Sequence, residues 1–197
     1  MISIQEMRQL EDNSNIPKIV LMENAGQSIA KILKEKFDLK DKRILIVAYH
    51  GNNGGDGFVA ARHLCDDAEV DVLFVGDETK LKGEGFANYK RIENNEKLQL
   101  LELEAVDFSD YDIIIDAIFG TGIEGEIKDP LATLIKNLSK AKSYKVSIDV
   151  PSGINPDTGE KANAFFEPDL IITMHDIKKG LVDYKDKTVV VDIGIKN

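Results

Sequence analysis

The chain has 197 residues, about the size of one α/β domain, and 43% of them are hydrophobic, which is enough to form a core. Because 35 Asp and Glu outnumber 25 Lys and Arg, the net charge of −10 opposes non-specific binding to nucleic acid or anionic lipid. No apolar run approaches the roughly 20 residues that cross a bilayer. With Cys65 as its only cysteine and no leader-like start, the chain is expected to be a cytoplasmic protein of one domain, residues 1–197.

The pattern over residues 4–37 predicts two helices. They are separated near residues 13–17, where Pro17 suits a helix start. In the second helix, apolar side chains recur at helical spacing at Ile19, Met22, Ala25, Ile29, Ile32 and Leu33. We expect this face to pack on a sheet.

Seven short apolar runs follow and alternate with longer helical patterns. They cover residues 43–49, 70–76, 98–104, 112–119, 145–150, 170–174 and 188–195. Nearly continuous Ile, Val and Leu are typical of strands that are covered on both faces. The predicted fold class is therefore α/β, with a mostly parallel sheet between helical layers and ligands at the carboxyl ends of the strands.

A glycine-rich segment, residues 51–57, follows the first predicted strand, and a helix is expected to begin around Phe58. Backbone N–H groups and a helix N-terminus at such a loop favour a phosphate or pyrophosphate ligand. The spacing matches neither G-x-G-x-x-G nor G-x-x-x-x-G-K-[ST], so nicotinamide-dependent oxidoreductase and NTPase chemistry are disfavoured. The alternative is a tight turn with Asp56 as a helix cap.

Two aspartates interrupt apolar strands. Asp116 ends the run from Ile113, and Asp149 precedes the turn Pro151-Ser152-Gly153. A buried carboxylate is costly unless donors or a cation compensate it, so Asp116 either contacts a cation or ligand or braces neighbouring loop amides. If both strands end at one rim, the two carboxylates meet the glycine-rich segment in a cleft that is suited to acid/base work.

Five segments together resemble the NAD(P)H-hydrate epimerase family, the YjeF N-terminal domain. They are LMENAG (21–26), GNNGGDGFVAARHL (51–64), DAIFGTG (116–122), SIDVPSGI (147–154) and KKGL (178–181). The resemblance implies a Rossmann-like three-layer α/β/α sandwich, commonly a homodimer. It also implies metabolite repair, in which the two epimers of hydrated NADH or NADPH are interconverted. A dehydratase then acts on one epimer, and because this chain ends at Asn197, that partner is expected to be a separate protein.

Site residues follow from the same resemblance. Asp149 is the expected catalytic acid/base, which cycles a proton to the departing hydroxyl and from the returning water, and it also contacts the substrate. The other substrate-binding residues implied are Asn52, Asn53, Gly54, Gly55, Asp56, Gly120, Thr121, Gly122, Ile123, Glu124, Gly125 and Glu126. A potassium ion is implied at Asn53, Asp116 and Ser152, whose oxygen atoms suit a hard monovalent cation.

The chain departs from the family pattern at several positions. Tyr49 stands where the opening glycine is common, and Glu124 and Glu126 lie where some relatives carry a lysine. His175 is expected to face the cleft, whereas His50 is more simply a hydrogen-bonded neighbour than a base.

The main alternative function is a non-catalytic nucleotide- or protein-binding module of the same fold, because relatives of the domain also serve as interaction units. The presence together of Asp149, Asp116, Asn53 and Ser152 favours the enzyme.

Overall fold

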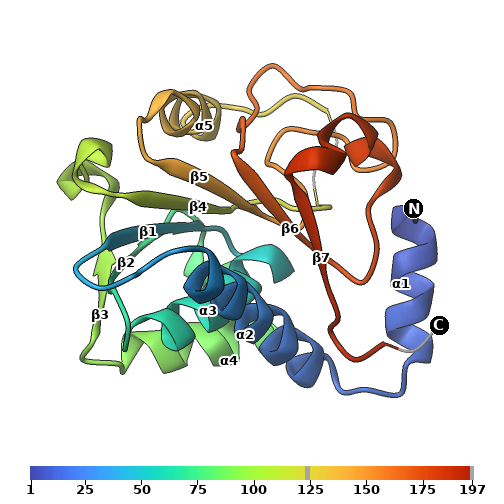
Figure 1. Cartoon of the computed structure of the whole chain (residues 1–197), viewed down its shortest axis with the longest axis horizontal. Helices are drawn as coiled ribbons and strands as arrows, with labels where there is room; N and C mark the ends of the chain where they lie inside the picture. The colour runs from blue at the N-terminus through green and yellow to red at the C-terminus, as the bar shows by residue number, and fades with distance from the viewer. Residues whose placement is uncertain (123–124, 196–197) are drawn as a thin grey trace.

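The computed structural model describes residues 1–122 and 125–195 and is organised around a seven-stranded sheet (Figure 1). The strand order is β3-β2-β1-β4-β5-β6-β7, and all six pairings are parallel. The strands are β1 (Arg43–Ala48), β2 (Glu69–Phe74), β3 (Leu98–Leu101), β4 (Ile113–Ala117), β5 (Tyr144–Ile148), β6 (Leu170–Met174) and β7 (Thr188–Val191). The seven predicted strands are confirmed, although several end earlier than predicted.

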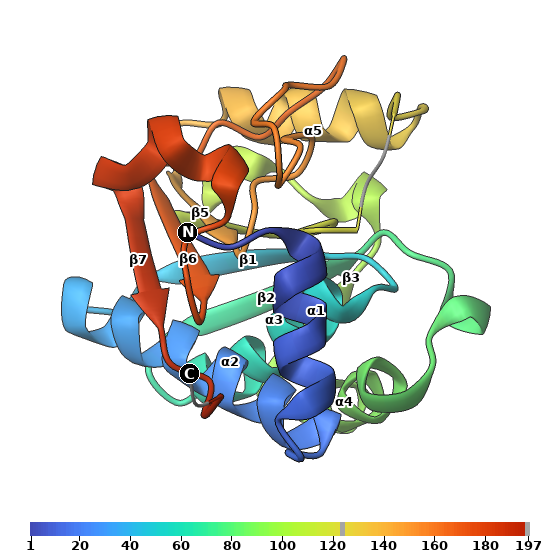
Figure 2. The ribbon, with the colours of Figure 1, turned by 90° about the vertical axis from the view of Figure 1, so that its right-hand side faces the viewer.

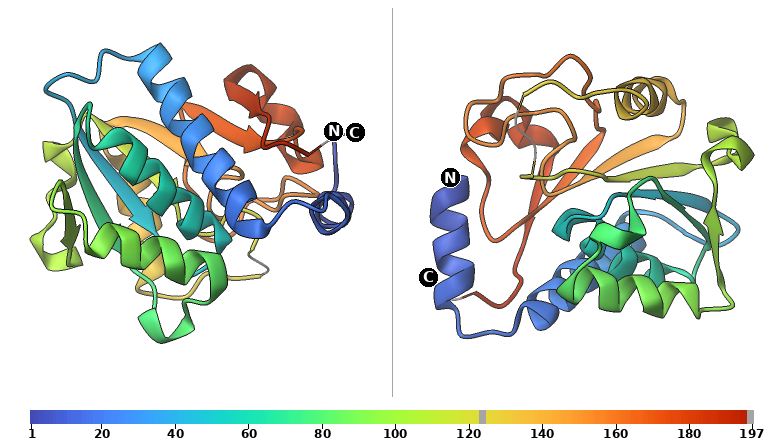
Figure 3. Two further views of the ribbon diagram at one scale, coloured as in Figure 1. Left: turned by 90° about the horizontal axis from the view of Figure 1, so that it is seen from below. Right: turned by 180° about the vertical axis from the view of Figure 1, so that it is seen from behind.

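Helices cover both faces of the sheet. Three of them, α2 (Lys18–Lys36), α3 (Asn52–Leu64) and α4 (Gly83–Glu93), lie side by side on one face, whereas α5 (Leu131–Lys140) lies on the other (Figures 1 and 3). Four short 3₁₀ segments are η1 (Glu78–Lys80), η2 (Leu103–Ala105), η3 (Phe108–Asp110) and η4 (Lys179–Lys187). The predicted three-layer α/β fold is therefore confirmed. Within the described residues, no helix is long and apolar enough to span a membrane.

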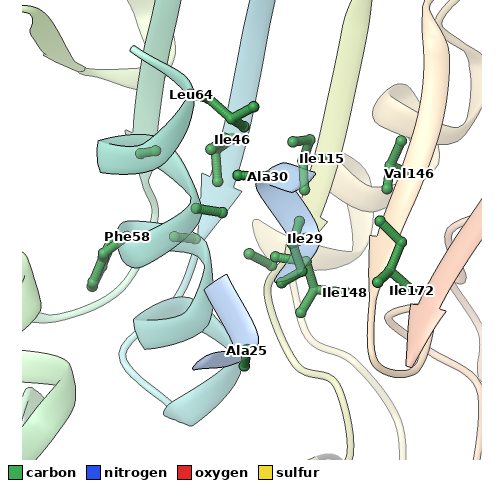
Figure 4. Packing of buried hydrophobic residues seen from close by; sticks show 14 of the residues in the cluster. Ala25, Ile29, Ala30, Ile46, Phe58, Leu64, Ile115, Val146, Ile148 and Ile172 are labelled. Carbon is green, nitrogen blue, oxygen red and sulfur yellow. The ribbon is translucent and has the colours of Figure 1, made fainter. Parts of the chain in front are cut away.

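Alternate residues of β1 point into two cores. Ile46 packs with α2 and α3, whereas Leu45 packs with α5. Figure 4 shows the first of these cores, in which sheet residues lie close to Ala25, Ile29, Phe58 and Leu64. Burial of such a side chain stabilises the fold by about 1.5–3 kcal/mol, so this core fixes the sheet against the helix that carries the glycine-rich segment.

The apolar face of α2 packs into this core, as predicted, but it also lies tightly against α3. A Cβ atom added at Gly26 would come within 2.4 Å of Val59, so only glycine permits this approach. Ile29 and Leu33 are fully buried, whereas Ile19 and Ile32 are only partly covered.

The prediction of a loop over residues 51–57 is wrong, because α3 already begins at Asn52 and Gly51 is its N-cap. None of the residues 51–57 has a positive φ, so the glycines there are not required for a turn. They permit close packing instead: an added Cβ would lie 1.8 Å from the Tyr49 carbonyl oxygen at Gly54 and 2.7 Å from Ala117 at Gly57. The segment is therefore the first turns of a helix pressed against the sheet.

Candidate functional site

A cleft of about 530 Å³ lies at the carboxyl ends of the central strands. Its lining comes from α1 (Ile4–Asn13), from the first residues of α2 and α3, from the end of β6 and from the segments that follow β1, β4, β5 and β6. The charged residues in the lining are Arg8, Glu11, Asp12, Lys18, Asp56, Asp149 and Lys178. In Figure 1, α1 stands apart from the helical layers at the right-hand side of the molecule, and Figure 2 views it from that side.

Helix α1 is held over the cleft by contacts at its N-terminus. Ser3 and Glu6 form a capping box that starts the helix. The Ile2 N–H donates to the Ile177 carbonyl at 2.9 Å, and the Ile4 N–H donates to Asp157 Oδ1 at 3.0 Å. The helix thereby presents the exposed Arg8 and the half-buried Glu11 to the cleft.

Asp149 directly follows β5 and has a left-handed backbone, with a φ of +63°. This conformation is uncommon for a residue other than glycine and is often found at functional sites. Its N–H donates to the Ile172 carbonyl at 2.8 Å, which fixes the strained turn against β6. Its Oδ1 accepts hydrogen bonds from Thr173 Oγ1 at 2.8 Å and pairs with Lys178 Nζ at 2.5 Å.

Asp56 and Glu11 face the same cleft as Asp149. Burial, followed by the negative charge of Asp149, holds the pKa of Asp56 well above its ordinary value of 3.8. The same two causes raise the pKa of Glu11. The cleft therefore combines a carboxyl group that favours its protonated form with a second carboxylate that is paired to a lysine. This combination is suited to general acid/base chemistry.

The start of α3 forms the floor of the cleft. Gly51, Asn52 and Asn53 line it, and the first N–H groups of a helix have no acceptor within the helix. With its amide nitrogen toward the Ile148 carbonyl (3.1 Å), Asn53 accepts from the Gly120 N–H at 3.2 Å. The helix N-terminus therefore offers an anion both N–H groups and a favourable dipole.

Gly54 and Gly55, predicted to bind substrate, are buried behind this floor against Tyr49 and Met22. They are absent from the lining of the cleft.

Asp116 is fully buried behind the cleft. It accepts four hydrogen bonds, at 2.7 Å from both Ser152 N–H and Ser152 Oγ, at 3.1 Å from the Ile118 N–H and at 3.3 Å from Ser147 Oγ. Burial raises the pKa of Asp116, and the bonds from Ser152 oppose that rise. In this arrangement the carboxylate braces the loops that follow β4 and β5.

The residues around Asp116 are chemically compatible with the implied potassium ion. Among the described residues, no cationic side chain forms an ion pair with this buried carboxylate, and the Ser152 hydroxyl oxygen lies 2.7 Å from it. The Asn53 amide, whose oxygen accepts from the Gly120 N–H, is a further oxygen donor at the start of α3. Hard oxygen donors suit potassium. Ser152 Oγ also accepts from the Phe119 N–H at 3.1 Å, so the group is continuous with the loop after β4.

The segment 120–126 does not lie along the cleft as one strip. Thr121 and Gly122 line it, and Gly120 lies against the Asn53 side chain. Gly125 and Glu126 line a separate hollow with residues near Gly153. Ile123 and Glu124, also predicted to bind substrate, lie outside the described residues.

Of the three histidines, His50 is the one that lines the cleft. His50 accepts from the Asp77 N–H at 3.2 Å and stacks on Tyr49, while burial and then Lys80 lower its pKa. His63 pairs with Glu23 at 2.7 Å. His175, which is expected from the sequence to face the cleft, is absent from its lining. Met174 and Lys178 of the same segment line the cleft instead.

Comparison with known proteins identifies the family. The profile described as "YjeF-related protein N-terminus" matches residues 18–180. The chain belongs to this family. It is 39% identical over 195 residues to the NAD(P)H-hydrate epimerase of Nitrosopumilus maritimus, which covers 95% of this chain and 90% of that protein. The corresponding protein of Cenarchaeum symbiosum is 38% identical and is covered to the same extent.

Longer family members also match. The bifunctional NAD(P)H-hydrate repair enzyme of Methanopyrus kandleri is 36% identical, and this chain spans only 39% of its length. Among solved structures, the yeast protein YNL200c superimposes with a TM-score of 0.84 at 25% identity, over 98% of this chain and 87% of that one. The YjeF N-terminal fold is therefore shared by this chain and the yeast protein.

Two contributors to the cleft were not found from the sequence. In the sequence, Lys178 belongs only to the family motif KKGL, and the pattern over α1 predicts a helix without indicating a role. One signal in the sequence points to Lys178: it soon follows Thr173, a threonine within a buried strand. No comparable signal in the sequence indicates that α1 lies over the cleft.

Proposed function

We propose that this protein is an NAD(P)H-hydrate epimerase, an isomerase that interconverts the two epimers of hydrated NADH or NADPH. The observation that carries the proposal is the joint placement of Asp56 and Asp149 in a cleft that begins at the N-terminus of α3. The names of the two relatives that align over 90% of their length support it. A substrate with a pyrophosphate and a ring that exchanges water requires these two features together.

The reaction needs proton transfer and no redox step. The hydrated ring carbon bears a hydroxyl beside the ring nitrogen, so protonation lets that hydroxyl leave as water while the nitrogen lone pair forms an iminium. The planar ring then accepts water on either face, and loss of a proton from that water restores the hydrate.

Asp56 and Asp149 each perform one of the two proton transfers. Asp56, whose pKa is raised, donates the proton to the departing hydroxyl. Asp149, paired with Lys178, accepts the proton from the incoming water. The proton returns from Asp149 to Asp56 through water in the cleft before the next turnover in the same direction. The N-terminal N–H groups of α3 hold the pyrophosphate and orient the ring.

A potassium ion held by Asn53, Asp116 and Ser152 belongs to the same proposal. When bound, it supplies positive charge that neutralises Asp116 and stiffens the loops after β4 and β5. Its test is thermal unfolding in KCl, NaCl and choline chloride at equal ionic strength. We expect a higher melting temperature in KCl, and this difference should disappear in Ser152→Ala. Equal melting temperatures in the three salts would contradict the site.

We also propose a partner activity, a cellular compartment and an oligomeric state. The names of the longer relatives support a repair pathway in which a second activity, which we propose is a dehydratase on a separate protein, consumes one epimer. A single cysteine in 197 residues is consistent with a reducing, cytoplasmic compartment. Exposed apolar side chains on both edge strands, Leu100 and Val190, are compatible with a homodimer, which sedimentation would test.

The deciding experiment gives the purified protein one epimer of hydrated NADH and follows the mixture by chromatography. We expect faster equilibration than in buffer, and a loss of about 10²–10⁴-fold in Asp149→Asn. Asparagine tolerates the left-handed backbone at this position, so the variant should fold. Asp66→Asn on the surface is the control. No acceleration by the folded protein in KCl would instead favour a non-catalytic binding module.

A further inference from the structure

Lys178 is a lysine without access to solvent. Its side chain is 1% exposed, whereas that of the adjacent Lys179 is 49% exposed. A buried ammonium is unfavourable unless all of its protons are matched by acceptors. The acceptors here are Asp149 Oδ1 at 2.5 Å, the Met174 carbonyl at 2.8 Å and Thr173 Oγ1 at 3.1 Å. All three N–H groups of the ammonium therefore have partners.

The two oxygens of the Asp149 carboxylate have different surroundings. Oδ1 accepts from Thr173 Oγ1 and, more weakly, from the Met174 N–H at 3.4 Å, in addition to its pairing with Lys178. In the described part of the chain, no donor is bonded to Oδ2. Because Asp149 lines the cleft, the arrangement holds the carboxylate by one oxygen and leaves the other for a ligand.

The segment that carries Lys178 is itself anchored. Residue 178 forms a parallel bridge with Ile2, and the Lys179 N–H donates to the Ile2 carbonyl at 3.1 Å. The preceding turn is tight, with a φ of +66° at His175. The position of the ammonium is therefore set by the sheet on one side and by the N-terminal segment on the other.

We propose that Lys178 is a positioning residue, which with Thr173 holds Asp149 through Oδ1 so that Oδ2 faces the reacting ring. The proposal rests on the proposed epimerase function. It adds a residue that acts through Asp149 rather than on the substrate. The ammonium is also a buried positive charge in a cleft to which Glu11 from α1, Asp56 from α3 and Asp149 all contribute carboxyl groups.

The test compares Lys178→Met with Lys179→Met, which removes an exposed lysine at the next position. We expect kcat to fall about 10²-fold in Lys178→Met with KM within about threefold, since misplacement of a reacting group by about 1 Å can have this effect. The acid limb of the kcat/KM profile should move to higher pH because the carboxyl groups lose their nearest cation. Lys178→Arg should recover part of the rate, and Lys179→Met should match the parent protein.

Two further measurements keep the outcome decisive. Thr173→Val preserves the charges of Asp149 and Lys178. We expect a loss of about tenfold in kcat without a shift of the pH profile. This variant tests the proposal if Lys178→Met does not fold. Carboxyl ¹³C NMR reports on the contact even if the protein catalyses a different reaction: the Asp149 signal should change in Lys178→Met and not in Lys179→Met. A folded Lys178→Met protein with the parent's kcat, pH profile and Asp149 signal would overturn the proposal.

Discussion

Ser152 donates both its backbone N–H and its hydroxyl to the carboxylate of Asp116, each at 2.7 Å. This double contact joins the loop after β5 to the end of β4, directly behind the cleft. Because Asp116 is fully buried, its removal would leave several donors without a partner.

We therefore expect Asp116→Ala to lower the free energy of unfolding by about 2–5 kcal/mol. Urea denaturation followed by circular dichroism measures this change. The control is Asp66→Ala, which removes a surface carboxylate that is paired with Lys97 and should have a much smaller effect. Equal stabilities of the two variants would show that the buried hydrogen bonds do not hold the loops.

Asp56 gives a pH-dependent prediction. The pKa of Asp56 in the folded protein lies well above the ordinary value of 3.8 that applies to the unfolded chain. At a pH between the unfolded and the folded pKa, the folded state therefore binds more protons than the unfolded state. Stability therefore falls as pH rises through that interval. We expect Asp56→Asn to melt at a higher temperature than the parent at pH 7, with the difference shrinking toward pH 4. The same variant should lose epimerase activity, a pattern common where function maintains a strained group.

Calorimetry at pH 4, 5, 6 and 7 measures the effect at Asp56, with Asp66→Asn as the control. The pKa of Asp66 is lowered by its hydrogen bond to Lys97, so its removal should give no gain at pH 7. A melting temperature for Asp56→Asn that is below that of the parent at pH 7 would contradict the prediction.

Arg8 on α1 should contribute to substrate affinity. It lines the cleft, and within the described residues it forms no ion pair, so its guanidinium is available to a phosphate oxygen. We expect Arg8→Ala to raise KM about 5–10-fold with little change in kcat. The effect should shrink as salt screens the charge. Lys31→Ala, an exposed charge on α2, should leave KM unchanged at all salt concentrations.

The early glycines of α3 give a prediction about packing. At Gly54 an added methyl would lie 1.8 Å from the Tyr49 carbonyl oxygen, so Gly54→Ala should destabilise the protein by about 1–3 kcal/mol or more. At Gly85 in α4, the nearest atom would be 3.9 Å away, and Gly85→Ala should stabilise by about 0.5–1 kcal/mol. Thermal denaturation of both variants should therefore give shifts of opposite sign.

Much of this architecture is predictable from residue patterns. Nearly continuous Ile and Val runs such as residues 43–48 predict buried parallel strands, and the observed register places the ends of β4 and β5 next to each other. The local sequence does not predict the start of α3, because Gly, Asn and Asp favour turns. Here tertiary packing, through the close approach of Gly54 to Tyr49, overrides that local preference.

Other parts of the cleft depend on contacts that local patterns do not contain. Lysine is almost never fully buried, and although Thr173 draws attention to Lys178, no local pattern predicts that the lysine pairs with an aspartate at the end of a different strand. Similarly, residues 120–126 form one motif in the sequence, but Gly120 and Gly125 both have positive φ values. The chain turns at both, and the two ends of the motif therefore face different hollows.

The placement of α1 has a consequence for protein engineering. This helix precedes the part of the chain that matches the family profile, which begins at residue 18, yet it supplies Arg8 and Glu11 to the cleft. The residues proposed for proton transfer come instead from the segment after β5 and from α3. Libraries that vary Arg8 and Asp12, which both line the cleft, would therefore explore new cofactor-like substrates while the residues proposed for proton transfer stay constant. Directed evolution can therefore change the part of the cleft that α1 lines without changing Asp56 or Asp149.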